Sequence, residues 1–192
     1  MKANRLEAFS AGVIAIIITI MVLELKVPHD HSLAGLLVMW PLFLSYAMSF
    51  LMVAIYWNNH HHLLHLARRV DGAVMWANLN LLFWLSLVPF TTAFLGENRA
   101  TPLAVALYGL NSALAGGAYY LLQRTIAAHA RADARLTQLH GCMLRKGRLA
   151  TALYVASVPL AWVSTWLALA LIVTPAIMYF IPDREVEKLM RE

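Results

Sequence analysis

Six long apolar runs limit this chain to a membrane fold. They cover residues 5–25, 33–57, 73–95, 102–123, 148–163 and 165–182, and 61% of all residues are hydrophobic. Because lipid offers no water to the backbone, a run of about 20 apolar residues crosses it as a helix, which bonds its own N–H and C=O groups. We therefore predict an all-α integral membrane protein, with six transmembrane helices in a single transmembrane domain over residues 1–192. The first run ends in "LELKVP" rather than in a small-residue cleavage site, so we expect it to stay in the mature chain.

The positive charges predict the orientation of the chain in the membrane. Most of the 15 Lys and Arg residues lie before the first run or after the second, fourth and sixth runs. Cytoplasmic segments of membrane proteins are enriched in Lys and Arg, so we expect a multi-pass plasma membrane protein with both termini in the cytoplasm. This topology explains the net charge of +5. The expected surroundings are therefore membrane lipid, and no nucleic acid partner is predicted.

The boundaries in the last third of the chain follow from helix propensity and proline. Residues 124–147 are rich in Ala, Leu and Arg, which predicts a cytoplasmic helical extension of the fourth span. Residues 148–182 are too many for one helix across about 30 Å of lipid. Pro159 and the "VST" sequence that follows it predict a turn, and hence two short spans, 148–163 and 165–182.

One face of the first span carries a hydroxyl among apolar side chains. Residues three, four and seven apart share a helix face, which places Ile16, Thr19, Ile20 and Leu23 on one stripe. One interpretation is a seam between helices, in which Thr19 bonds back to the carbonyl of Ala15. The alternative is a pore: several copies of the stripe around an axis make a narrow hydrophobic channel that gates by dewetting.

The histidine-rich end of the second apolar run raises the question of a metal. His61 and His65 have the i,i+4 spacing that zinc and iron sites use. Only one such histidine box is present, however, and no carboxylate lies nearer in sequence than Asp71. We therefore predict a hydrogen-bonded cluster between helices and no metal ligand, with proton sensing as the alternative. No side chain here suggests a nucleophile with a base, so we expect no catalytic residue. Asn78, in the third run, is expected to bond across helices.

Several stretches resemble a known family. "RLEAFSAGVIAIIITIMVLELKVP" resembles the opening of the prokaryotic transmembrane protein 175 family, the lysosomal and bacterial potassium channels, whose signature is Arg, three residues, then Phe-Ser-Asp. Arg5, Phe9 and Ser10 match this signature, and Ala11 departs from it. "YWNNHHHLLH", "NLLFWLSLVPFTTAFLGE" and the ending "IPDREVEK" are also similar to the family, so the resemblance covers essentially the whole chain.

The resemblance implies a homotetramer in which the first helix of each chain lines a central pore. It implies that the stripe forms the constriction, with Thr19 as the hydroxyl ring that favours potassium. A network that braces the pore helix is also implied, and Ala11 removes a carboxylate from it. The implied network residues are Arg5, Phe9, Ser10, Ala11, Trp57, Asn59, His60 and His61. Glu24 lies near the outer end, where it either concentrates cations at the mouth or pairs with Lys26.

These observations lead to the prediction of a potassium-preferring cation channel with a hydrophobic constriction, which conducts passively across the plasma membrane. We expect no enzyme activity and no cofactor, and potassium is the permeant ion. The alternative is a secondary transporter or proton-coupled carrier, which would require an ionisable residue near mid-membrane, and we place none there. A membrane metalloenzyme is the third reading.

Overall fold

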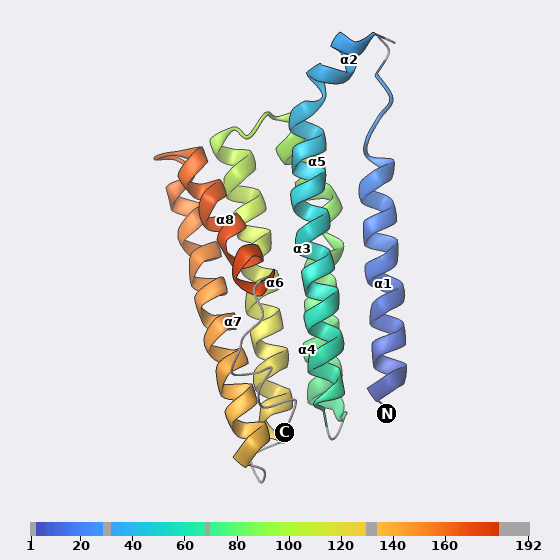
Figure 1. Cartoon of the computed structure of the whole chain (residues 1–192), viewed down its shortest axis with the longest axis vertical. Coiled ribbons are helices and arrows are strands. Elements are labelled where there is room, and N and C mark those ends of the chain that lie inside the picture. Colours follow the sequence, from blue (N-terminus) through green and yellow to red (C-terminus); the bar gives the residue numbers. More distant parts are fainter. Residues whose placement is uncertain (1–2, 29–31, 68–69, 130–133, 181–192) are drawn as a thin grey trace.

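The computed structural model of the chain describes residues 3–28, 32–67, 70–129 and 134–180. Within these ranges the chain forms α-helices and no strand (Figure 1). The helices are α1 (Ala3–Leu23), α2 (Leu33–Val38), α3 (Trp40–His65), α4 (Gly72–Ser86), α5 (Val88–Glu97), α6 (Pro102–Ala128), α7 (Ala134–Leu160) and α8 (Thr165–Phe180).

The long helices stand side by side along the long axis of the molecule (Figure 1). α1 lies at one edge of the bundle and packs on α3, α4 and α5. α6 contacts α4, α5 and α7, and α8 packs on α7, α6 and α3. The chain therefore covers only one side of its own first helix.

Prolines divide two of the predicted spans. Pro41 lies in the first turn of α3 and Pro89 in the first turn of α5, where the missing N–H costs no helical hydrogen bond. Accordingly the run predicted as 33–57 splits into the short α2 and the long α3, which continues to His65. The run predicted as 73–95 splits into α4 and α5 with Leu87 between them.

The segment 124–147 extends the fourth span only in its first residues, 124–128, and not over its whole length as predicted. α6 ends at Ala128, and residues 134–147 instead begin α7, which continues without a break to Leu160. Apart from Gly141 and Gly147, mostly helix-favouring residues run on from this segment into the fifth apolar run, and no proline separates the two. Residues 130–133 of the segment, and residues 181–182 of the predicted last span, lie outside the described residues. The chain turns between Leu160 and Thr165, within the segment where Pro159 and "VST" predict a turn.

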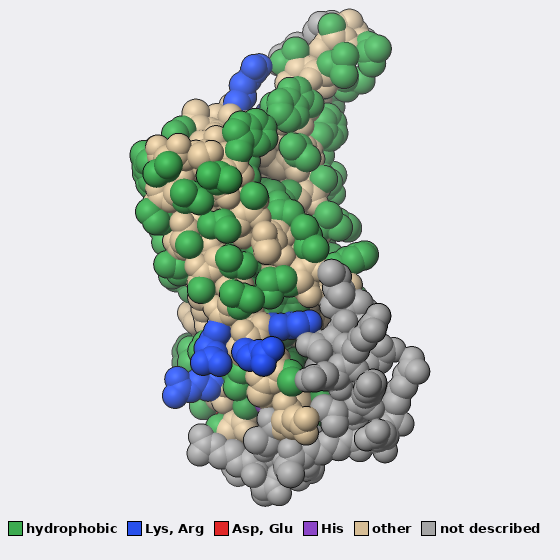
Figure 2. Space-filling model, turned by 60° about the vertical axis from the view of Figure 1, so that its left-hand side comes forward, with side chains coloured by type: hydrophobic (Ala, Val, Ile, Leu, Met, Phe, Trp, Pro, Cys, Tyr) green, Lys and Arg blue, Asp and Glu red, His purple; other side chains and the backbone are tan. Residues whose placement is uncertain are grey.

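Several helices of the described chain have the length and composition of membrane spans. By length and composition, Ala3–Leu23, Trp40–His65 and Gly72–Glu97 are long and apolar enough to cross a membrane, and Thr165–Phe180 is a shorter apolar helix. Figure 2 shows a broad hydrophobic surface, with most of the visible Lys and Arg side chains gathered below it. Basic residues of the described chain at this end include Arg124 on α6, and Arg145, Lys146 and Arg148 on α7.

The start of α4 is fixed by a carboxylate outside the spans. Asp71 is the N-cap, and its Oδ1 accepts a hydrogen bond of 3.0 Å from the N–H of Val74. Its other oxygen lies 3.0 Å from Nε2 of His129, at the end of α6. The Val74 N–H holds the pKa of Asp71 below its ordinary value of 3.8, and His129 acts in the same direction. The ionised cap therefore stabilises the folded state above that pH.

We expect Asp71→Ala to lower the melting temperature in detergent at pH 7, and Asp71→Asn to lower it less, because asparagine also caps helices. Since the folded-state pKa is lowered, the contribution of Asp71 is lost as pH falls below about 4. The difference in melting temperature between wild type and Asp71→Ala should shrink over that range. A difference that stays constant from pH 7 to pH 3 would show that the charge of Asp71 is not what stabilises the turn.

Candidate functional site

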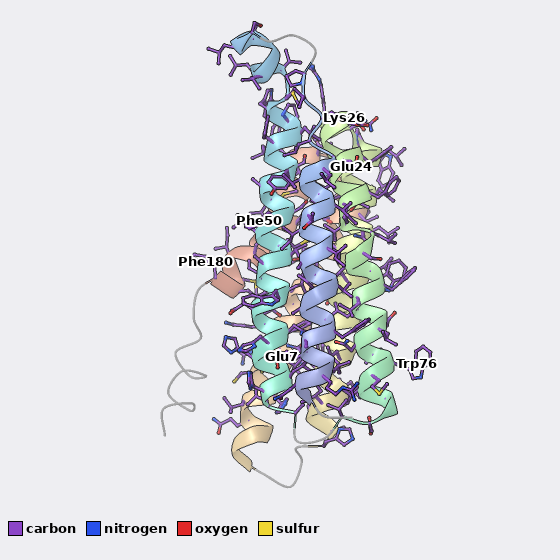
Figure 3. The ribbon with its side chains drawn as sticks, turned by 90° about the vertical axis from the view of Figure 1, so that its right-hand side faces the viewer. Glu7, Glu24, Lys26, Phe50, Trp76 and Phe180 are labelled. Atoms are coloured by element: carbon purple, nitrogen blue, oxygen red, sulfur yellow. The ribbon has the colours of Figure 1, made fainter. Side chains whose placement is uncertain are left out.

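α1 has one buried face and one open face. Its buried residues follow a helical repeat and pack against α3, α4 and α5. They are Leu6, Ser10, Ile14, Ile17 and Met21, each no more than 3% exposed. Figure 3 shows α1 standing in front of α3 and of α4 and α5, with its other side uncovered.

The predicted stripe lies on the uncovered side. Ile16 is 60% exposed, Ile20 42% and Leu23 73%, and Thr19 is also exposed. We call these four residues the open stripe. Phe9, at 54%, continues the same face toward the N-terminus. The stripe is therefore not a seam within one chain.

The threonine of the open stripe keeps its oxygen available. The Oγ1 of Thr19 donates a hydrogen bond of 3.0 Å to the carbonyl of Ala15, as the seam interpretation also required. This bond uses the hydroxyl hydrogen, and the oxygen lone pairs stay free to accept from water or to contact a cation.

A buried chain of hydrogen bonds ties the lower part of α1 to two other helices. Nε2 of His60 lies 2.6 Å from Oδ1 of Asn78, and Nδ2 of Asn78 donates to Oγ of Ser10 at 3.0 Å. Ser10 in turn donates to the carbonyl of Leu6 at 2.8 Å. All three side chains are buried, with exposures of 3% or less. We call Ser10, Asn78 and His60 the anchor chain; it joins α1, α4 and α3.

A second polar contact joins α1 to α3 close by. Oε1 of Glu7 lies 2.6 Å from Nδ1 of His61 and 4.0 Å from Nε2 of His65. The ring of Trp57 is stacked on that of His61, with centroids 6.2 Å apart. Figure 3 labels Glu7 at the lower end of α1, beside α3. We call Glu7, His61 and His65 the histidine–carboxylate cluster.

The other residues of the predicted network stand apart from these contacts. Arg5 is exposed and, within the described part of the chain, has no hydrogen bond or ion pair. Asn59 donates to the carbonyl of Ile55 on its own helix, at 2.8 Å. Phe9 is on the open face, and Ala11 is half-buried.

Two partners were not assigned to the network from the sequence. Asn78 was expected only to bond across helices, and the structure places it between Ser10 and His60. Glu7 was given no role, although it lies three residues before Ser10 and therefore on the same face of the helix. That spacing was the one available signal, because the histidines lie 54 residues further along the chain.

The C-terminal end of α1 has a single ion pair among the described residues. Lys26 pairs with Glu97 at 3.5 Å rather than with Glu24, and both partners are exposed. Glu24 is exposed as well.

Comparison with known proteins places the chain in a family. Residues 5–89 match the family described as "Endosomal/lysosomal potassium channel TMEM175". A potassium channel of Chryseobacterium sp. (strain P1-3) is 41% identical over the full length of both chains, and a potassium channel of Streptomyces collinus is 41% identical over 57% of each.

A solved structure shares the fold. The crystal structure of a lysosomal potassium-selective channel TMEM175 homolog from Chamaesiphon minutus is 30% identical, with a TM-score of 0.73. The match covers 93% of this chain and 96% of that one. The prediction of an all-α membrane protein is thereby confirmed. Together with the full-length relative, this similarity shows that the chain belongs to the TMEM175 family of channels.

Proposed function

We propose that this protein is a potassium-preferring cation channel formed by four copies of the chain, with α1 of each copy lining a central pore. The observation that carries the proposal is the open stripe, which its own subunit leaves uncovered while the opposite face of α1 is buried. A relative that matches the whole chain is named a potassium channel. The number four comes from the family resemblance of the sequence.

A ring of hydrophobic side chains controls the passage of ions because the pore at that ring is either dry or filled with water. Ile16, Ile20 and Leu23 offer an ion no replacement for its water, so a narrow pore lined by them is dry and closed until it widens. Passive conduction then needs no energy source. An alternating-access carrier would need ionisable groups at mid-membrane, and the open stripe contains none.

Potassium preference is assigned to Thr19. The chain lacks the "TVGYG" sequence of conventional potassium filters, so a ring of backbone carbonyls is not its source of selectivity. Four Thr19 oxygens, each with its hydrogen bonded to Ala15, present lone pairs to the axis. Potassium sheds water more easily than sodium, which favours it at such a weak ring.

The basic residues near the C-terminal end of α6 and in the middle of α7 support a cytoplasmic location for that part of the bundle. The N-terminus of α1 lies at the same end in Figure 1. We accordingly propose a plasma membrane channel with both termini in the cytoplasm. Glu24 then lies at the outer mouth, where its charge attracts cations.

Flux from liposomes tests the function directly. Purified protein should dissipate a potassium gradient without a coupled ion, and mass measurement in detergent should give four chains per particle. Saturable exchange that requires a second ion would instead support a carrier.

We expect Thr19→Ala to leave the tetramer intact and to move the potassium-to-sodium permeability ratio toward one, because the ring loses its oxygens. Thr19→Ser keeps the hydroxyl and should retain more of the preference. Reversal potentials under bi-ionic conditions measure the ratio. An unchanged ratio in Thr19→Ala would remove Thr19 from the selectivity mechanism.

Ile20→Asn should raise the basal potassium current, because a polar ring holds water in the constriction. Ile14→Asn, on the buried face, is the control. It should instead destabilise the protein. The expected loss is no smaller than that of a large-to-small core substitution, which costs about 2–5 kcal/mol. Single-channel recordings and melting curves separate the two effects. Equal behaviour of the two variants would contradict a pore along the open stripe.

The anchor chain is proposed to hold α1 in place. Asn78→Leu leaves the ring nitrogen of His60 without its partner, at a cost of about 1–3 kcal/mol for that buried group, while Ser10 keeps its bond to the carbonyl of Leu6. We expect a lower melting temperature and an altered open probability. Asn80→Leu, on the exposed side of the same helix, is the matched control and should change neither. If both variants melt alike, the anchor chain does not stabilise the subunit.

A further inference from the structure

The histidine–carboxylate cluster contains a second histidine that the hydrogen bond between Glu7 and His61 does not need. His61 and Glu7 form a pair by themselves, with 2.6 Å between Nδ1 and Oε1. Nε2 of His65 lies 4.0 Å from the same carboxylate oxygen, which is beyond hydrogen-bond distance. The rings of His61 and His65 are one helical turn apart, with centroids separated by 4.3 Å. One carboxylate oxygen and two imidazole nitrogens thus lie close together between α1 and α3.

The absence of a nearby carboxylate was one of two reasons to expect no metal at these histidines, the other being that only one histidine box is present. The fold removes the first reason, because it brings Glu7 of α1 against the end of α3. One ligand atom from each of Glu7, His61 and His65 lies within 4.8 Å of the other two. Two imidazoles and a carboxylate are a ligand set that Zn²⁺ uses in sites that keep a fourth position open to water.

The distances are close to those of a loaded site. With metal–ligand bonds of about 2.0–2.1 Å in tetrahedral geometry, neighbouring ligand atoms lie about 3.3 Å apart. The Glu7–His61 pair at 2.6 Å must open, and the Glu7–His65 pair at 4.0 Å must close, each by less than about 1 Å. Small changes in side-chain torsions supply such shifts. The side chains are 24%, 41% and 60% exposed for Glu7, His61 and His65, so an ion reaches them from water.

We propose that Glu7, His61 and His65 form a binding site for a divalent transition-metal ion, best matched by Zn²⁺, that clamps the N-terminal end of α1 to the C-terminal end of α3. The bound ion replaces the proton between Glu7 and His61 and adds His65 as a third ligand. Imidazole ligands favour zinc and its neighbours over magnesium and calcium, which prefer oxygen ligands.

If the protein conducts as proposed above, a metal ion bound at this cluster also affects conduction. α1 carries the open stripe, so an ion that fixes its end to α3 restrains the helix whose movement widens the constriction. Zn²⁺ on the cytoplasmic side is therefore expected to lower potassium flux.

Zinc binding to metal-free protein in detergent tests the site without reference to conduction. Competition with a chromophoric chelator should give one Zn²⁺ per chain, and the melting temperature should rise with free Zn²⁺ by mass action. His65→Gln keeps the Glu7–His61 pair and should lower the affinity at least about tenfold, since even residues that only support metal ligands contribute that much. His62→Gln is the matched control, because His62 is an exposed histidine of the same helix outside the cluster. It should bind as wild type does.

Three results would overturn the inference or part of it. No binding at micromolar free Zn²⁺, or equal loss of affinity in His62→Gln and His65→Gln, overturns the site. Zn²⁺ that binds but lowers potassium flux equally in wild type and Glu7→Gln, each compared with its own metal-free flux, overturns the clamp. Absence of flux from metal-free wild type contradicts the proposed channel function instead, and the zinc titration still decides the site.

Discussion

The lipid interior supplies no hydrogen-bond partners, and the arrangement of polar side chains in this bundle follows from that constraint. Ser49 of α3 bonds to Tyr108 of α6 at 2.9 Å and accepts from Thr92 of α5 at 2.7 Å. The anchor chain does the same for α1, α3 and α4. Polar residues are therefore placed where helices meet, and they specify which helices are neighbours more sharply than apolar packing does.

Along α1 these contacts are concentrated in the N-terminal turns. Glu7 and Ser10 reach α3 and α4, whereas above Ser10 the buried residues Ile14, Ile17 and Met21 make apolar contacts, with a 4.0 Å contact from Thr92 to the sulfur of Met21. Hydrogen bonds are directional and apolar packing is not, so the lower part of α1 is held more firmly than the part that carries the open stripe. A proposed cytoplasmic metal would act on the firm end and not on the constriction itself.

The periodicity of the sequence predicted which residues share a face of α1. It did not predict which residues of different helices bond to each other. The open stripe was found from residue spacing alone, because the two faces of a helix are a local property of the sequence. The partners of His60 and His61 lie 18 and 54 residues away, and only the packing of α1, α3 and α4 brings them together. The same limit explains residues 134–147: their helical propensity was evident, but the helix to which they belong depends on a turn near His129 that propensity does not place.

The alanine of the signature can be understood from the same contacts. Positions 5 and 11 are six residues apart, which is about 120° around a helix, so Arg5 and the side chain at position 11 do not share a face. Arg5 lies on the face of the open stripe and is exposed, where water or lipid phosphate serves it. On the face toward α3 and α4, the acceptors are Oδ1 of Asn78 for His60 and the Glu7 carboxylate for His61. Since both histidines already have an acceptor, Ala11 leaves neither of them unpaired, and a carboxylate at that position would add a further negative charge one turn above Glu7.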